Sequence, residues 1–237
     1  MNELTIRDEA FIEGLSERID SRYGKRFADV LSAFILLVAL APLLILIAIA
    51  IKLETSGPVI FRQERMGSRP RRSNGATVWE PTPFVFLKFR TMSASADPSL
   101  HRAHVEAFVR GRLGRSNENA SFKLDGDPRV TRVGGLLRKT SLDELPQLIN
   151  VIRGEMSLVG PRPVPLYEFA LYDERQQRRM AAIPGLTGLW QVRGRCDVSF
   201  EEMIELDLAY VRDRSFWLDV KILFLTIPAV VGGRGAG

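Results

Sequence analysis

An uncharged apolar run over residues 30–51 constrains this chain more than any other segment. At ~1.5 Å per residue, one helix of this length just covers a hydrocarbon core of ~30 Å. Pro42 lies in the middle of the run, where it removes a backbone donor and kinks a helix. Because membrane-spanning helices tolerate proline, two topologies fit: one spanning helix, or a helix-break-helix that enters and leaves by the same face.

Basic residues on both sides of the run bear on that choice. The positive-inside tendency would keep both flanks in the cytoplasm, which favours the helix-break-helix. Taken together, the residues alone favour neither topology over the other. The basic flanking residues are Arg18, Arg22, Lys25 and Arg26 before the run, and Lys52, Arg62, Arg65, Arg69, Arg71 and Arg72 after it.

Charge and cysteine usage limit the function classes. The chain of 237 residues has a net charge of +5 and a pI of about 9.6. This balance predicts an anionic partner, which is a lipid headgroup, a nucleotide or a nucleic acid. Cys196 is the only cysteine, which excludes a disulfide framework and a cysteine metal site and fits a reducing compartment. The sequence also lacks a P-loop, a dinucleotide-binding glycine pattern and a Ser-His-Asp arrangement.

Hydrophobic periodicity and turn residues predict the remaining elements. Strand composition at residues 59–61 and 83–89 predicts a small β-hairpin, with the Arg-, Pro-, Ser- and Gly-rich residues 67–83 as its loop. The apolar residues 216–231 predict a helix that lies in a membrane interface or, equally, in the protein core. Further helices are expected over 1–24, 100–111, 145–153, 166–182 and 200–212, and irregular segments over 112–128 and 154–165.

An adjacent acid pair, Asp143 and Glu144, lies among arginines. A helix start would explain the pair without chemistry, since Ser141 with Glu144 matches a capping box and Asp143 could itself cap a helix that opens just after it. Taken alone, the pattern favours the helix start. A chemical role is compatible with it, because a helix N-terminus attracts phosphate, an aspartate can attack phosphorus and a neighbouring carboxylate can hold Mg²⁺.

Several further residues are candidates for binding phosphate. Lys88 and Arg90 end an apolar strand, and Arg162 is stiffened by a proline on each side. Arg195 lies in a glycine turn. The alternatives are an edge strand with solvated charges and ordinary turns. Asp207 is either a surface acid, which is the commoner case, or a second metal ligand.

Taken together, the motifs resemble the bacterial sugar transferase family, in particular the monotopic polyprenol-phosphate phosphoglycosyl transferases. The resemblance runs from Lys25 to about Gly235, and its ordered blocks are far more specific than any single motif. They are Lys25-Arg26 with Asp29, the apolar run with Pro42, Gly57-Pro58-Val59-Ile60-Phe61, Lys88-Phe89-Arg90-Thr91-Met92, Ser141-Leu142-Asp143-Glu144-Leu145-Pro146-Gln147, Ser157-Leu158-Val159-Gly160-Pro161-Arg162-Pro163, Pro184-Gly185-Leu186-Thr187-Gly188, Gln191-Val192 with Gly194-Arg195, and Asp207 with Tyr210-Val211.

This resemblance implies a reaction. Members of the family transfer sugar 1-phosphate from a UDP-sugar to undecaprenyl phosphate, releasing UMP and forming a lipid-linked diphosphosugar. The resemblance makes Asp143 the nucleophile that forms a phosphosugar-aspartyl intermediate and Glu144 its Mg²⁺-associated partner. Arg162 would bind the nucleotide end, and Asp207 would belong to the metal region. The remaining phosphate-binding cations would be Lys88, Arg90, Arg138 and Arg195.

The same resemblance favours a re-entrant hairpin broken at Pro42. The expected fold class is therefore α+β, mainly helical, with a re-entrant membrane helix-break-helix, interfacial amphipathic helices and a small β-hairpin. The expected organisation is an N-terminal amphipathic helix (1–24), a re-entrant membrane hairpin (25–56) and a cytoplasmic membrane-associated catalytic domain (57–237). The expected location is the bacterial inner membrane, with exopolysaccharide biosynthesis as the process and nucleic acid excluded as a partner.

Two departures from the family and three rival interpretations complete the sequence evidence. Ala41 precedes the proline where family members often have serine, and the basic segment before Pro83 is long for the family. The chain could instead be a non-catalytic membrane scaffold that binds anionic lipid through its arginines. It could also catalyse the same transfer by direct attack of the lipid phosphate, with Asp143 only a metal ligand. The third rival is a single-pass topology.

Overall fold

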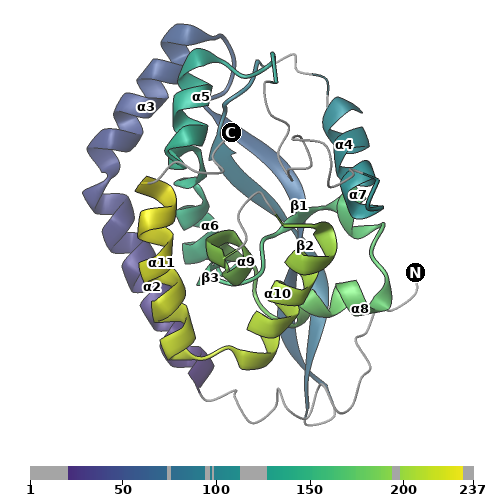
Figure 1. Ribbon diagram of the computed structural model, residues 1–237. Helices are drawn as coiled ribbons and strands as arrows, with labels where there is room; N and C mark the ends of the chain where they lie inside the picture. Colours follow the sequence, from purple (N-terminus) through teal and green to yellow (C-terminus); the bar gives the residue numbers. More distant parts are fainter. Residues whose placement is uncertain are drawn as a thin grey trace.

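The computed structural model describes residues 21–73, 76–93, 97, 99–112, 127–193 and 198–231, arranged as helices around a long β-hairpin (Figure 1). The predicted helix over residues 1–24 lies outside the described residues, except for residues 21–24 at the start of α2 (Ser21–Ala39). Most of the predicted loop over residues 112–128 also lies outside them.

The apolar run forms two helices with a sharp bend between them. Helix α2 ends at Ala39, and α3 (Ala41–Glu54) begins directly after Leu40 with proline in its first turn. The two helices are bent by 63°. Pro42 therefore begins a second helix, a position where its missing N–H costs no helical hydrogen bond. No single helix in the described part of the chain is long and apolar enough to cross a membrane, whereas this bent pair together meets that requirement in length and composition.

The long hairpin is the main departure from the predicted elements. Strand β1 (Ile60–Ser73) pairs antiparallel with β2 (Ala76–Phe89) along its whole length, from Ile60 opposite Phe89 to Ser73 opposite Ala76. The prediction of a loop over residues 67–83 is therefore wrong. Pro81 and Pro83 are tolerated because β2 is an edge strand in the sheet order β2-β1-β4. Pro70 lies on β1, beyond the two residues, Arg65 and Met66, at which β4 pairs with that strand.

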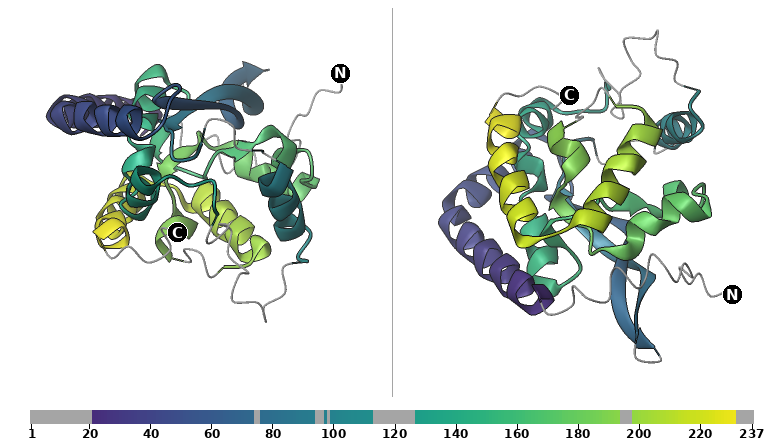
Figure 2. Two further views of the ribbon diagram at one scale, coloured as in Figure 1. Left: turned by 90° about the horizontal axis from the view of Figure 1, so that it is seen from above. Right: turned by 60° about the horizontal axis from the view of Figure 1, so that its bottom comes forward.

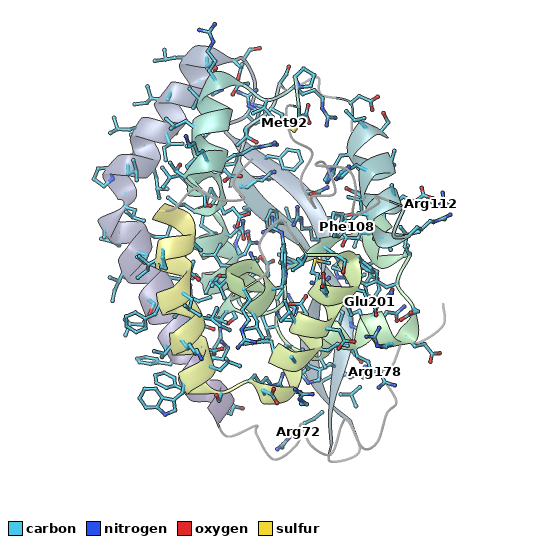
Figure 3. The ribbon with its side chains drawn as sticks, viewed as in Figure 1. Arg72, Met92, Phe108, Arg112, Arg178 and Glu201 are labelled. Carbon is cyan, nitrogen blue, oxygen red and sulfur yellow. The ribbon has the colours of Figure 1, made fainter. Side chains whose placement is uncertain are left out.

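Packing contacts explain why the two strands stay paired through residues 67–83, where a loop was predicted. Trp79 is 6% exposed and has the Arg214 guanidinium 5.1 Å from its ring centroid. Gly67 lies against the Phe84 ring, where a Cβ would approach a ring carbon to 2.9 Å. The tip extends past the rest of the molecule (Figure 2), and its cations Arg69, Arg71 and Arg72 are exposed. Figure 3 shows Arg72 near this tip and Met92 beyond the opposite end of β2.

The predicted helix over residues 166–182 is also wrong, because the segment forms three short helices: α7 (Leu166–Phe169), α8 (Glu174–Gln177) and the 3₁₀ helix η2 (Arg178–Ala181). Asp173 interrupts it by capping α8, with its side chain accepting from the Gln176 backbone N–H. The predicted irregular segment contains two short strands, β3 (Ser157–Val159) and β4 (Val164–Pro165).

The remaining helices are α4 (Ser99–Val109), α5 (Arg132–Lys139), the 3₁₀ helix η1 (Leu142–Glu144), α6 (Gln147–Arg153), α9 (Leu189–Arg193), α10 (Phe200–Asp213) and α11 (Phe216–Val231). Strand β3 pairs in parallel with β5 (Gly185–Thr187), and β4 pairs with β1. Of the remaining elements, α4, α6 and α10 match the helices predicted over 100–111, 145–153 and 200–212, whereas α5, η1, β5 and α9 were not predicted. The mixed helix and sheet content confirms the predicted α+β class.

Apolar side chains are exposed on the bent pair and on α11, which lies beside α2 in Figures 1 and 2. On α11, Ile222 is fully buried, whereas Trp217 is 77% exposed. This helix therefore has one face in the core and one outside it, and its location in a membrane interface stays a prediction. The other exposed apolar residues of these helices include Phe34, Ile35, Val38, Ile45, Leu46, Phe216, Phe224 and Ile227.

Candidate active site

The acid pair lies on η1, and neither helix-capping interpretation describes it. Ser141, at the N-cap of η1, makes no side-chain cap bond, and Pro146 rather than Asp143 precedes α6. The Glu144 carboxylate instead accepts a hydrogen bond from Arg162 Nη2 at 3.0 Å. Ser141 has φ of 56°, a left-handed conformation that is uncommon and costly for a residue with a side chain. The turn that presents the two acids is therefore strained, and neither acid is the N-cap of η1 or α6.

Four cations from different elements surround this pair. Lys88 comes from β2, Arg138 from α5, Arg162 from the segment after β3, and Arg65 from β1. Burial lowers the pKa of Lys88 to about 8, with Asp143 opposing the shift and the positive charges of Arg65 and Arg138 adding to it. These mutual effects show that residues distant in sequence share one electrostatic site.

The pKa values of two buried arginines shift in opposite directions, although burial acts to lower both. It lowers the pKa of Arg65 to about 10, and the nearby charge of Arg162 adds to the shift. Burial also acts to lower the pKa of Arg162, but Glu144 offsets this and the pKa of Arg162 is raised overall. The Arg162–Glu144 ion pair lies next to Asp143, which is 8% exposed.

The structure brings Lys88, Arg138 and Arg162 to the acid pair, as the predicted site requires. Arg138 is held in place by its Nε donating to Thr91 Oγ1 at 3.0 Å. Arg90 is engaged elsewhere, since its Nη2 donates to the Thr55 carbonyl at 2.9 Å and its Nη1 to the Ser56 carbonyl, just after α3. Arg195 lies outside the described residues.

Asp207 lies on α10, and its side chain is fully buried in an ion pair with Arg179. It is therefore not a surface acid. Its assignment to the metal region stays a prediction.

Arg65 is the residue that sequence reasoning missed. It lies between the predicted strand over residues 59–61 and the predicted loop over residues 67–83, and the sequence assigns it only to a basic flank. In the structure its Nη1 donates to the Pro163 carbonyl at 2.8 Å, and its guanidinium lies 4.0 Å from the Phe86 ring centroid. No local signal distinguishes it, because residues 62–65 are all polar and show no alternation of polar and apolar side chains.

The donor set fits a magnesium ion better than a metal that needs a protein cage. In the described ranges, no group of three or more His, Cys, Asp or Glu side chains is placed to hold a metal ion. Asp143 and Glu144 together offer carboxylate oxygens. Mg²⁺ is commonly held by one or two carboxylates, with phosphate oxygens and water completing its shell. The carboxylates with the surrounding cations suit chemistry on a phosphate ester or diphosphate.

Comparison with known proteins identifies the family. The model of the bacterial sugar transferase family matches residues 20–233. The chain belongs to this family. The predicted class of enzyme, a phosphoglycosyl transferase, is confirmed by that match and by the relatives. The match covers both the bent helix pair and the elements that carry the acid pair.

Three relatives illustrate the range of the family. The exopolysaccharide production protein ExoY of Rhizobium meliloti (strain 1021) is 44% identical over 216 residues, which cover 90% of this chain and 88% of the relative. The UDP-glucose:undecaprenyl-phosphate glucose-1-phosphate transferase of Caulobacter vibrioides is 42% identical, over 87% of this chain and 69% of the relative. The undecaprenyl-phosphate galactose phosphotransferase of Salmonella typhimurium is 37% identical, over 91% of this chain and 42% of the relative.

Proposed function

We propose that this enzyme transfers sugar 1-phosphate from a UDP-sugar to undecaprenyl phosphate, releasing UMP, in exopolysaccharide biosynthesis. The observation that carries the proposal is the buried Asp143 beside the Glu144–Arg162 ion pair, with Asp143 and Arg138 close enough to Lys88 for their charges to shift its pKa. The names of the glucose- and galactose-phosphate transferases among the relatives support this substrate class. The reaction brings two anionic substrates together, which the cations make electrostatically possible.

In the proposed reaction, an Asp143 carboxylate oxygen attacks the phosphorus that carries the sugar. The new aspartyl O–P bond forms as the bond to the bridging oxygen breaks, and UMP leaves with that oxygen. An oxygen of undecaprenyl phosphate then attacks the same phosphorus and releases Asp143 as a carboxylate. Arg162 binds the nucleotide end, while Lys88 and Arg138 balance the phosphoryl charge. The covalent intermediate lets a soluble donor leave before a lipid acceptor enters.

Mg²⁺ is the cofactor in this proposal. Asp143 and Glu144 would hold it together with the donor diphosphate, and a bound Mg²⁺ neutralises phosphate charge and stabilises the leaving group. Glu144 would then serve both the ion and Arg162. Its ion pair with Arg162 orients this carboxylate at the site before substrate binds.

The bent helix pair supports a membrane location. We propose that α2 and α3 enter and leave the bacterial inner membrane by its cytoplasmic face, with residues 57–237 on that face. The 63° bend and the exposed apolar residues of both helices favour this topology over a single pass. Single-cysteine labelling at residues 1 and 237 in a Cys196→Ser background tests it, because a single pass places these two positions on opposite faces.

Measured UMP release tests the reaction. Membrane-bound protein is given Mg²⁺, undecaprenyl phosphate and each of a panel of UDP-sugars, with Asp143→Asn and Asp213→Asn beside the wild type. Asp213 is 56% exposed at its side chain, so it controls for the same chemical change away from the site. Release with one donor, lost only in Asp143→Asn, is expected and names the sugar. Equal release in all three proteins would show that Asp143 is not essential.

The direct-attack mechanism makes a different prediction about the intermediate. With a donor labelled in the sugar-bearing phosphate and no acceptor lipid, the covalent mechanism leaves label on the protein. Direct attack of the lipid phosphate leaves none. The scaffold alternative predicts no turnover with any donor, and membership in an enzyme family argues against it.

A further inference from the structure

Two buried arginines donate hydrogen bonds to the backbone carbonyls of Arg162 and its neighbour. Arg179 Nη2 donates to the Arg162 carbonyl at 3.0 Å, and Arg65 Nη1 donates to the Pro163 carbonyl at 2.8 Å. Pro161 and Pro163 flank Arg162 and have no N–H, so they cannot donate backbone hydrogen bonds. The position of Arg162 therefore depends strongly on side chains that reach it from elsewhere in the fold.

Arg179 is itself fixed by a buried polar network. Its Nη2 also pairs with Asp207 Oδ2, and both side chains are fully buried. Its Nη1 donates to the Tyr172 hydroxyl at 2.9 Å, and that hydroxyl donates to Glu168 Oε1 at 2.6 Å. The Arg179 guanidinium thus connects three parts of the fold: η2, which carries it, α10 through Asp207, and the segment after β3 through the Arg162 carbonyl.

Such a pair is a costly way to stabilise a fold. Desolvating two charges often offsets the gain from their attraction, so an apolar pair of similar volume is commonly as stable. A buried ion pair whose guanidinium also binds a backbone carbonyl of the candidate active site has a different use. It fixes the direction of one hydrogen bond, and through it the place of Arg162.

We propose that Arg179 and Asp207 are positioning residues that fix Arg162 for the nucleotide end of the donor, a nucleoside diphosphate. This inference rests on the proposed function, which gives Arg162 that role. It assigns to Asp207 a task other than metal binding, because its Oδ2 is engaged by Arg179.

The proposal predicts that Asp207 acts only through Arg162. Asp207→Asn keeps the shape but removes the charge that holds Arg179. We expect the KM for the UDP-sugar to rise about tenfold, with kcat changed less than about threefold, because the lost interaction is one of binding. In an Arg162→Ala background the same substitution should cause no further rise in KM, since residues acting as one unit are not additive. Tyr172→Phe, which removes one bond to Arg179, should raise KM in the same direction by less.

Controls separate positioning from general loosening and from metal binding. Ile204→Val shortens a fully buried side chain of the same helix and removes none of the network's hydrogen-bonding groups, so it should lower the melting temperature while leaving KM unchanged. The Mg²⁺ concentration that gives half-maximal rate should be the same in Asp207→Asn and wild type. A shifted Mg²⁺ requirement, or a further rise in KM from Asp207→Asn in the Arg162→Ala background, would overturn the proposal.

Nucleotide binding provides a readout that does not depend on turnover. The Kd of UMP, measured by calorimetry on the detergent-solubilised full chain, should rise in Asp207→Asn and in Arg162→Ala, and no further in the double variant. If wild type turns over no donor, the proposed function fails while this comparison still decides the inference. An unchanged UMP affinity in Asp207→Asn would refute the inference while leaving the proposed reaction intact.

Discussion

Two adjacent glycines in α5 differ sharply in their surroundings and give a matched test of how Arg138 is placed. A Cβ built on Gly134 would lie 2.1 Å from the Thr91 carbonyl oxygen and 2.7 Å from its carbonyl carbon. A Cβ on Gly135 would meet nothing within 4 Å. The helix therefore packs directly on the Thr91 backbone, and Thr91 also accepts the hydrogen bond from Arg138 Nε.

Alanine at each position separates helix propensity from this contact. Gly→Ala in a helix stabilises by about 0.5–1 kcal/mol, so Gly135→Ala should be slightly more stable than wild type. Gly134→Ala gains the same term but must displace backbone, and overpacking of this kind costs about 1–3 kcal/mol. Because 2.1 Å is far inside any real Cβ contact, the upper end applies, and the two variants should differ by about 3 kcal/mol.

Chemical denaturation of the two variants in one detergent measures this difference, with UMP release measured in parallel. We expect Gly134→Ala alone to lose activity, because moving α5 away from Thr91 moves Arg138 away from the acid pair. Equal stabilities of the two variants would refute the close approach of α5 to Thr91. Lost stability with unchanged turnover would refute the link between this packing and Arg138.

Three further predictions concern other parts of the molecule. Burial lowers the pKa of Lys88 to about 8, so kcat/KM should fall as the pH rises through that value and the lysine loses its charge. Lys88→Arg should remove this fall, and an unchanged pH profile in the variant would exclude Lys88 as its source. Trp217→Ala removes an exposed indole at the start of α11 and should increase the protein released from membranes by salt wash, whereas equal release would place α11 away from the lipid. Glu54→Gln weakens the acceptor for the first N–H groups of α5 and should cost about 1 kcal/mol of stability, which the exposed control Glu64→Gln should not.

Local sequence signals predicted the elements whose pattern is self-contained. Helix α10 has its apolar face and its Ser199 cap within one short segment, and the prediction of residues 200–212 matches Phe200–Asp213 closely. Pro42 likewise marked the break between α2 and α3. The hairpin was mispredicted because its outer half is held by contacts distant in sequence, such as Trp79 with Arg214. Glycine and proline there read as turn residues until the partners that pack on them are known.

The candidate site divides in the same way. Asp143, Glu144 and Arg162 stand in short motifs and were found from the sequence, whereas Arg65 joins them only because β1 pairs with β4. Asp207 shows the opposite limit. The sequence left it as a surface acid or a second metal ligand, because its partner Arg179 lies 28 positions away and no local pattern connects the two.

Polar contacts at both ends of the bent helix pair connect it to the candidate active site. At its start, Lys25 pairs with Asp219 of α11 at 2.5 Å, and Asp29 accepts from Ser157 Oγ of β3 at 2.7 Å. At its end, Glu54 accepts a hydrogen bond at 2.7 Å from the backbone N–H of Arg132, which is the first residue of α5.

The helix that carries Arg138 is thus capped by a side chain from the apolar pair itself. Because each contact is a charged or buried hydrogen bond, the pair is not free to tilt without disturbing β3 or α5. The bent helix pair, which a membrane would hold, is therefore rigidly connected to the cations that would bind a lipid phosphate. This arrangement would set the height of the acid pair above a lipid surface, which a reaction between a soluble donor and a lipid-borne acceptor requires.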